Sequence, residues 1–207
     1  MVPVVGFVGF IGSGKGTAGD ILCEKGYIRE SFAKGVKDVA SQMFGWPRGM
    51  LEGDTEDSRK WRETPDRYWS AKFGRDFTPR EALQKLGTEV GRDVFHQDFW
   101  VFELENRLKY HDSPIVITDV RFPNEINWIR SVGGKVYEIQ RGSNPPWYKF
   151  LKATHPEKDK LSRWDIMSDY DVHHSEWAWV GCKVDGTIKN DGSIEDLTNL
   201  LNLVIID

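Results

Sequence analysis

Short, uniformly apolar runs alternate with longer segments whose apolar residues return every three or four positions. The runs Val4 to Val8 and Ile115 to Ile117 are β-branched and too short for helices. Such runs are typical of strands in a parallel sheet that is covered on both faces. Lys135 to Ile139 alternates polar and apolar residues and predicts another strand. Ile28 to Phe32 predicts a short second strand, and Lys183 to Lys189 predicts a hairpin or a final strand.

Helical spacing marks several segments between these strands. Thr78 is followed by Pro79 and then by Glu81, a combination that favours the N-terminus of a helix. Ser193 is expected to cap the last helix in the same way. Other helices are predicted over 18–22, 33–44, 98–110 and 124–132. The expected buried positions are Val36, Val39, Ala40 and Met43 in the 33–44 helix, and Ala82, Leu83, Leu86 and Val90 in the helix after Thr78.

A glycine-rich turn joins the first strand to the first helix. Residues 9–17 read Gly-Phe-Ile-Gly-Ser-Gly-Lys-Gly-Thr, which is the pattern of a phosphate-binding loop in the required strand–turn–helix context. Glycines let successive backbone N–H groups face phosphate oxygens, and the helix N-terminus adds partial positive charge. Lys15 is placed to reach the β- and γ-phosphates. Gly16 occupies the usual Ser/Thr position, and the hydroxyl comes one residue later at Thr17, as in adenylate-kinase-like loops. The turn predicts binding of a nucleoside triphosphate.

A second chemical motif follows the strand Ile115 to Ile117. Asp119 stands at its carboxyl end, and Arg121 follows two residues later. Ligands of parallel sheets bind beyond the carboxyl ends of the strands, so Asp119 is expected to face the same cleft as the glycine-rich turn. A carboxylate there can hold Mg²⁺, and an arginine can neutralise a transferring phosphate. The alternative is that Asp119 caps the next helix and Arg121 lies on the surface.

Several other features admit two interpretations. Lys37, in the first turn of its helix, is either an anion ligand or a solvated surface lysine. Gly87 interrupts a helix, which a close approach by another group would explain, and Trp100 is either a core residue or a platform for a base. Residues 46–80 form either a substrate-closing insertion or a solvated one, and residues 142–173 form either a lid or a surface excursion.

The bulk composition narrows the class of protein. The 207 residues are 39% hydrophobic and 29% charged, which indicates a soluble globular domain. A net charge of −4 argues against a broad nucleic-acid-binding surface. Cys23 and Cys182 suggest neither a disulfide framework nor a zinc site. Without an apolar run long enough to span a membrane, the chain is expected to be cytoplasmic, in the host cytoplasm if it is encoded by a phage.

These motifs together resemble the bacteriophage deoxynucleoside-monophosphate kinases, a branch of the P-loop nucleotide kinases. The resemblance covers nearly the whole chain, in the order of the family. Its pieces are the loop 9–17, the segments 33–38, 61–64, 83–89 and 99–101, the segment 117–121 with Glu125, and the Asn-Asp-Gly-Ser turn at 190–193.

The resemblance implies an α/β fold of the P-loop kinase type, a parallel sheet flanked by helices, with a substrate-binding insertion and a lid. It implies one domain over 1–207, with a core of 1–45, 81–141 and 174–207, an insertion near 46–80 and a lid near 142–173. The implied ATP-binding residues are Ile11, Gly12, Ser13, Gly14, Lys15, Gly16 and Thr17. The implied acceptor-binding residues are Val36, Lys37, Arg62, Gly87, Trp100, Asp119, Arg121 and Glu125.

The expected reaction is transfer of the γ-phosphoryl group of ATP to a deoxynucleoside monophosphate, which yields the diphosphate and ADP. Lys15, Asp119 and Arg121 are the expected catalytic residues, and Thr17 and Asp119 are expected to support Mg²⁺. The rival functions are a dephospho-coenzyme A kinase or another small-molecule P-loop kinase, and a nucleotide-sensing module without catalysis. A nucleic-acid-binding ATPase fits the charge poorly. Exposed-looking aromatics allow a homodimer.

Overall fold

The computed structural model describes residues 3–206, which divide into two compact units. The first unit contains the chain up to Ser31 and from Tyr110 onward, and the second contains Phe32–Lys109. The expected insertion, 46–80, lies inside the second unit, which begins and ends well beyond it. The difference arises because the predicted helix over 33–44 packs on the insertion, and Trp100 of the predicted helix over 98–110 belongs to the same apolar core. The assignment of core, insertion and lid stays a prediction.

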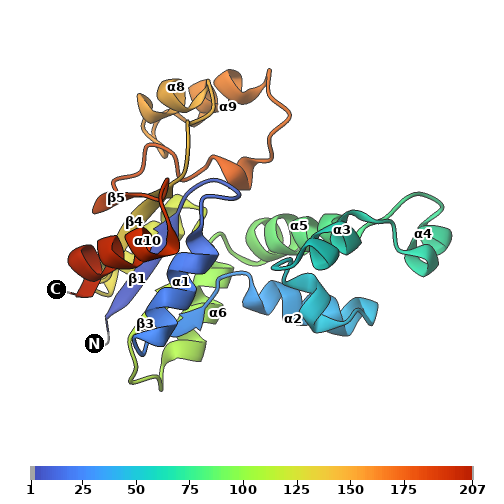
Figure 1. Ribbon diagram of the computed structural model, residues 1–207. Helices are drawn as coiled ribbons and strands as arrows, with labels where there is room; N and C mark the ends of the chain where they lie inside the picture. The colour runs from blue at the N-terminus through green and yellow to red at the C-terminus, as the bar shows by residue number, and fades with distance from the viewer. Residues whose placement is uncertain (1–2, 207) are drawn as a thin grey trace. The chain divides into compact units, whose positions relative to one another are not determined.

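The first unit is built on a five-stranded parallel sheet with the order β2-β3-β1-β4-β5 (Figure 1). The strands are β1 (Val4–Val8), β2 (Ile28–Glu30), β3 (Ile115–Ile117), β4 (Lys135–Gln140) and β5 (Gly186–Lys189). Every residue of β1 and β3 is buried, as their apolar sequences predict. The last strand pairs in parallel with β4 in the register Ile139 to Ile188, so it is a final strand of the sheet.

Helices cover both faces of this sheet, so the predicted α/β class is confirmed. Helices α1 (Lys15–Glu24) and α10 (Ile194–Leu201) pack together over one face, where Phe7, Leu22 and Ile139 are fully buried. Helix α7 (Pro123–Ser131) packs over the other face against β1 and β4. Ser193 accepts a bond from the Asp196 amide, as expected of a cap. A π-helical turn, η4 (Asn202–Ile206), follows α10.

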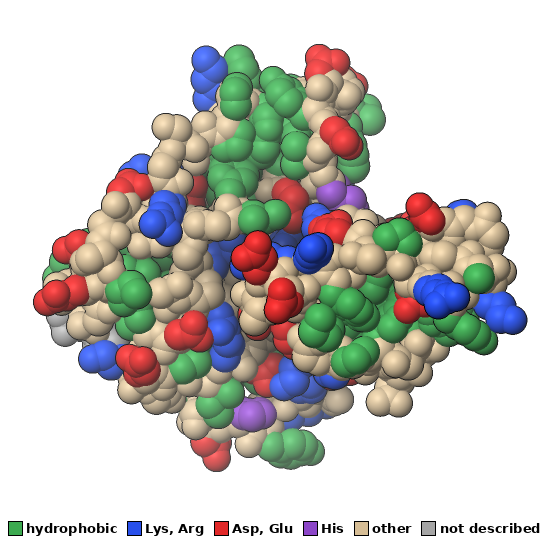
Figure 2. All heavy atoms as spheres, turned by 45° about the vertical axis from the view of Figure 1, so that its right-hand side comes forward, with side chains coloured by type: hydrophobic (Ala, Val, Ile, Leu, Met, Phe, Trp, Pro, Cys, Tyr) green, Lys and Arg blue, Asp and Glu red, His purple; other side chains and the backbone are tan. Residues whose placement is uncertain are grey.

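Two short helices stand apart from the sheet in the same unit. They are α8 (Tyr148–Lys152) and α9 (Lys160–Met167), and the 3₁₀ turn η3 (His174–Glu176) follows them. Hydrophobic side chains gather on the surface of this segment (Figure 2), including Phe150, Leu161 and Trp164, which are each more than half exposed. Within residues 3–206, no helix is both long enough and apolar enough to cross a lipid bilayer.

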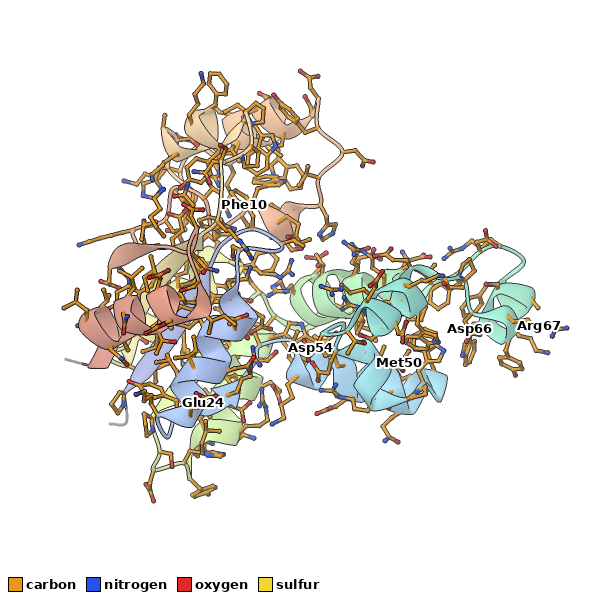
Figure 3. All side chains as sticks on the ribbon, viewed as in Figure 1. Phe10, Glu24, Met50, Asp54, Asp66 and Arg67 are labelled. Atoms are coloured by element: carbon orange, nitrogen blue, oxygen red, sulfur yellow. The ribbon has the colours of Figure 1, made fainter. Side chains whose placement is uncertain are left out.

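The second unit is helical. Its elements are α2 (Lys34–Phe44), η1 (Arg48–Leu51), α3 (Glu56–Glu63), α4 (Arg67–Phe73), α5 (Pro79–Lys85), the π-helix η2 (Leu86–Phe95) and α6 (Phe99–Leu108). Its core contains Trp46, Leu51, Phe77, Ala82 and Trp100. Asp66 accepts bonds from the Trp46 indole at 2.9 Å and from the amide of Trp69 at 2.8 Å, and so connects α4 to this core (Figure 3).

Three of the expected core positions in this unit are exposed. Val39 and Met43 are 41% and 58% exposed because α2 buries only the neighbouring stripe that contains Val36 and Ala40. Val90 is 39% exposed, although Ala82 and Leu86 are buried as expected. The helix changes from α to π after Lys85, so the rotation per residue that an α-helical pattern assumes does not hold at Val90.

The π-helix accommodates the indole of Trp100. The indole nitrogen donates to the carbonyl oxygen of Gly87 at 2.8 Å, and a Cβ at Gly91 would overlap the ring. Gly87 itself has space for a Cβ, because the nearest side-chain atoms, those of Val36, lie 3.8 Å away. The close approach expected at Gly87 therefore involves its carbonyl group, and the missing side chain matters at Gly91.

We expect Gly91→Ala to reduce the free energy of unfolding by about 1–3 kcal/mol, because Trp100 or the helix must shift to admit the methyl group. Gly87→Ala is the matched control, and it should be neutral or slightly stabilising because alanine restricts the unfolded chain. Urea unfolding monitored by tryptophan fluorescence measures both variants. Equal stability of the two variants would contradict the proposed packing of the indole.

Candidate active site

The turn between β1 and α1 has the backbone shape that its glycines predict. Gly9, Gly12 and Gly14 all have positive φ angles, and Gly14 is the residue that precedes the first turn of α1. A side chain at Gly9 would also meet the carbonyl oxygen of Ile139 in β4. Glycine is therefore required here both by backbone conformation and by close packing. The turn leaves Ile11, Gly12, Gly16 and Thr17 exposed at the start of α1.

Lys15 lies inside this turn. Its ammonium group donates to the carbonyl oxygens of Gly9 at 2.7 Å and Phe10 at 2.9 Å. Burial lowers the pKa of Lys15 from 10.5 to about 8, assisted by the positive charge of Arg121 and opposed by Glu176 and Asp119. These effects show that Arg121, Glu176 and Asp119 are all near Lys15, so the two motifs at the ends of β1 and β3 come together as the sequence predicts.

Asn190 fastens the turn to the end of β5. Its side-chain amide donates to the carbonyl oxygen of Ser13 at 2.8 Å, and a Cβ at Gly14 would overlap that amide. The Ser13 hydroxyl is buried and has no hydrogen-bond partner among the described residues. The next residue, Asp191, accepts a bond from the Gly142 amide at 2.6 Å. The Asn-Asp-Gly-Ser turn therefore holds the glycine-rich turn through the bond from Asn190 to Ser13.

Asp119 lies two residues after the end of β3, and it is partly exposed. It accepts a hydrogen bond from the Ser31 hydroxyl at 2.7 Å. Arg29 connects the same region to α1, because it donates to the carbonyl oxygen of Gly16 at 3.0 Å and to Asp20 at 2.8 Å. The alternative in which Asp119 caps α7 is not observed, since that helix begins at Pro123.

Arg121 is held by groups on both sides. Its guanidinium forms an ion pair with Glu176 and donates to the Ser175 hydroxyl at 3.3 Å. Its backbone amide donates to Glu125 at 2.7 Å, and the same carboxylate oxygen accepts the Phe122 amide at 3.0 Å. Glu125 is only 2% exposed. In this structure its carboxylate orients the loop that carries Arg121, and no surface is left for a direct contact with a ligand.

A cavity of about 230 Å³ adjoins the glycine-rich turn on the side of β4. Its walls include Phe10, Gly12, Ser13, Glu138, Arg141 and Asn144. The carboxylate of Glu138 is buried there and accepts a bond from the hydroxyl of Tyr148 at 2.9 Å, and burial and this carboxylate raise the pKa of Tyr148. The cavity provides backbone amides, a guanidinium and a carboxylate at one side of the turn.

Phe10 ties the turn to the segment that carries α8 and α9. Its ring contacts those of Trp147, Tyr148 and Trp179, with centroid separations of 5.5, 5.8 and 5.2 Å. Figure 3 shows Phe10 between the first helix of the sheet and the segment of α8 and α9. Arg163, buried in the same segment, donates to the carbonyl oxygens of Trp177 and Ala178, directly after Glu176. Residues 142–181 are therefore anchored at the turn and at Arg121.

The remaining expected acceptor residues lie in the second unit. Lys37 forms an ion pair with Glu52 at 2.5 Å, and the Arg62 guanidinium lies against Gly53. Val36 and Trp100 are buried, and the carbonyl oxygen of Gly87 accepts bonds from Trp100 and from Arg92. The expected site residues therefore belong to two separate groups, one in each unit.

Sequence analysis missed several residues of these groups. Glu52 gives no signal as a site residue, because the sequence does not show that its carboxylate meets Lys37, which lies 15 positions away. Asn190 belongs to a turn that was noticed, but its bond to Ser13 spans 177 positions. Among residues 3–206, no three His, Cys, Asp or Glu side chains are grouped so that they could hold a metal ion by themselves.

We expect Asn190→Asp to destabilise the protein more than Asn190→Ala does. The alanine leaves the Ser13 carbonyl without its donor, at a cost of about 1–3 kcal/mol. The aspartate also places a carboxylate oxygen against that carbonyl in a position that is only 8% exposed. Denaturant unfolding at pH 7 compares the two variants, and wild-type stability of Asn190→Asp would contradict the bond to Ser13.

The lowered pKa of Lys15 predicts a pH-dependent difference in stability between the wild type and Lys15→Met. Folding disfavours the protonated amine, so the wild type carries a cost that is complete below pH 8 and disappears as the pH rises from about 8 to 10.5. At about 1.4 kcal/mol per pH unit, the wild type should gain up to about 3 kcal/mol relative to the variant over that range. Parallel urea-unfolding results for the two proteins between pH 7 and 10 would contradict the lowered pKa.

No protein-family model matches the chain. A protein of Acanthamoeba polyphaga mimivirus named as a deoxynucleotide monophosphate kinase is 33% identical over 151 residues, which cover 67% of this chain and 74% of that protein. The deoxynucleoside-5′-monophosphate kinase of Escherichia phage T5 is 30% identical, with 78% of this chain and 86% of that protein covered.

Among solved structures, the dephospho-CoA kinase of Campylobacter jejuni matches over 100% of this chain and 96% of its own, at 17% identity and a TM-score of 0.46. That score is too low to say anything about function. The two viral relatives match most of their own lengths at 30% identity or more. The chain belongs to the family of deoxynucleoside monophosphate kinases, and it is a phosphotransferase.

Proposed function

We propose that this kinase transfers the γ-phosphoryl group of ATP to a deoxynucleoside 5′-monophosphate, which yields the deoxynucleoside diphosphate and ADP. The observation that carries the proposal is the grouping of Lys15, Asp119 and Arg121 at the carboxyl ends of β1 and β3. The names of the two viral relatives support the choice of acceptor. We assign Lys15, Asp119 and Arg121 as the catalytic residues.

The donor site is assigned to the glycine-rich turn, with Ile11, Gly12, Ser13, Gly14, Lys15, Gly16 and Thr17 as its residues. Backbone amides of the turn bind the phosphates, and Lys15 leaves its two carbonyl acceptors to bind the β- and γ-phosphate oxygens. Phosphate oxygens also favour the protonated amine, so donor binding should raise the pKa of Lys15 above 8. The adjoining cavity offers space beside the phosphates for the rest of the donor.

The residues near the donor site suit Mg²⁺ that arrives with the nucleotide. Mg²⁺ is usually held by one or two protein oxygens together with substrate phosphates and water, so no cage of protein ligands is required. Thr17 provides an exposed hydroxyl and Asp119 a carboxylate that is fixed by Ser31. Thr17 and Asp119 would hold the ion, which would offset phosphate charge when bound.

The acceptor site is assigned to Val36, Lys37, Arg62, Gly87 and Trp100 of the second unit and to Asp119 and Arg121 of the first. Glu125 was expected among the contacts, and its burial under the Arg121 loop assigns it a positioning role instead. Arg121 can exchange its ion pair with Glu176 for an ion pair with phosphate.

The chemistry needs positioning and neutralisation of charge more than it needs a general base. A phosphate oxygen of the acceptor is already nucleophilic near neutral pH, and the transition state spreads negative charge over the transferring group. Lys15 and Arg121 provide positive charge at this group, and Lys37 and Arg62 hold the acceptor. We also propose that residues 46–80 and 142–173 exclude water from the reaction. Binding of nucleic acid is not part of the proposal, and a homodimer stays a prediction.

The first experiment measures ADP release from ATP and Mg²⁺ with a panel of ribo- and deoxyribonucleoside monophosphates and dephospho-coenzyme A. Turnover with deoxynucleotides supports the proposal if the turnover rate falls by at least about 100-fold in Arg121→Ala while the circular dichroism spectrum is unchanged. Turnover only with dephospho-coenzyme A would transfer the assignment to that kinase. ATP binding without turnover across the panel would indicate a nucleotide sensor and contradict the proposal.

A further inference from the structure

A single carboxylate in the second unit connects two cationic side chains. One oxygen of Glu52 accepts from the Lys37 ammonium at 2.5 Å, and the other accepts from the guanidinium of Arg48. Arg48 also donates to Asp38 at 2.5 Å. Lys37 is among the expected acceptor residues, whereas neither the sequence motifs nor the proposed mechanism uses Arg48 or Glu52.

The turn formed by Glu52 and Gly53 also positions the side chain of Arg62. Gly53 has a φ of +72°, and a Cβ there would overlap the Arg62 guanidinium. Arg62 points back to the carbonyl oxygen of Glu52, with a donor–acceptor separation of 3.5 Å. The turn therefore contacts three cations. The two carboxylate oxygens of Glu52 bind Lys37 and Arg48, and Arg62 lies against Gly53, where there is no side chain.

The turn is fixed to the core of its unit. Leu51, directly before Glu52, is fully buried against the apolar core. The η1 turn that begins at Arg48 follows Trp46, whose carbonyl oxygen accepts from Ser41 at 2.7 Å. In Figure 3 the turn lies between the labelled residues Met50 and Asp54. Because the turn is anchored on both sides, its side chains are held in place.

The cluster brings charges of both signs together. Lys37, Arg48 and Arg62 contribute three positive charges, and Glu52 and Asp38 contribute two negative charges. Burial raises the pKa of Glu52, but the hydrogen bonds and charges of Lys37 and Arg48 outweigh it and lower the pKa overall. Glu52 is therefore ionised at neutral pH and offsets the repulsion between its two cations.

We infer that the Glu52–Gly53 turn is the positioning element of the acceptor-phosphate site, and that it assembles Lys37, Arg48 and Arg62 into one three-cation group. This inference rests on the proposed function, because it names the residues that position the acceptor phosphate. Glu52 and Gly53 act through the cations and not by contact with the substrate. Arg48 joins Lys37 and Arg62 as a phosphate-binding side chain.

The test measures the KM for the deoxynucleotide and the KM for ATP separately in Glu52→Gln, Glu52→Asp and Arg48→Gln. Glu52→Gln keeps the size of the side chain and removes the charge that holds Lys37 and Arg48 together. We expect its KM for the deoxynucleotide to rise at least fivefold, while the KM for ATP stays within twofold. Arg48→Gln should also raise the KM for the deoxynucleotide. Glu52→Asp keeps the negative charge, so its KM for the deoxynucleotide should lie between those of the wild type and Glu52→Gln.

Glu81→Gln is the matched control. It makes the same substitution in the same unit and removes a carboxylate that binds Arg75 at 2.6 and 2.8 Å on the surface. Both kinetic constants should stay within twofold of the wild type. Thermal unfolding of every variant identifies any loss of folded protein.

Two results would overturn the inference while the proposed function stands. One is a deoxynucleotide KM within twofold of the wild type in Glu52→Gln, and the other is an equal rise of both KM values, which indicates a general structural role. A wild-type enzyme that uses no deoxynucleotide would instead overturn the proposed function, and this inference with it.

Discussion

Cationic side chains that lie close together repel each other, and this protein holds them in place with carboxylates. Arg121 lies near Lys15 and is paired with Glu176, whereas Lys37 and Arg48 share Glu52. In water the repulsion between such cations is modest, but it grows as the groups are buried. A carboxylate between or beside them removes most of that cost and fixes their direction. Each of the two units contains one such arrangement, built from residues 55 positions apart in the first unit and from residues within 15 positions of Glu52 in the second.

The parallel sheet supplies the frame for the arrangement in the first unit. Because β1 and β3 are neighbours and parallel, the residues that follow them emerge at the same edge of the sheet. Lys15 and Asp119 are therefore near each other at this edge. Asn190 at the end of β5 and Phe10 at the end of β1 then hold the turn from two sides. These contacts support the part of the turn to which the phosphates of the proposed donor are assigned.

The second unit depends on glycine in a different way. Gly91 allows the indole of Trp100 to lie against the helix backbone, and Gly53 allows the guanidinium of Arg62 to lie against a turn. In both cases the absent side chain makes room for a flat polar group that would otherwise have no place. Helix propensity alone treats a glycine as a cost. Here the glycines permit packing that a larger residue would prevent.

Much of the fold could be predicted from the sequence, because it is encoded over a few residues. The apolar runs of β1 and β3, the caps at Thr78 and Ser193 and the glycine-rich turn all lie where the pattern predicts. Such features depend on side-chain periodicity and local hydrogen bonds, which a sequence displays directly. The expectation that Asp119 comes near Lys15 also held, because it follows from the rule for parallel strands.

The tertiary structure decided the pairings that no local pattern contains. Glu176 meets Arg121 across 55 positions and Asn190 meets Ser13 across 177, and each contact depends on how the strands are ordered. The exposure of Val39 and Val90 likewise followed from which helix faces had partners, and from the widening of the helix after Lys85. The sequence by itself determined the chemistry of the glycine-rich turn and the elements around it. Only the folded chain decided which carboxylates hold Arg121 and Lys37, because those distances are set by packing and not by spacing along the chain.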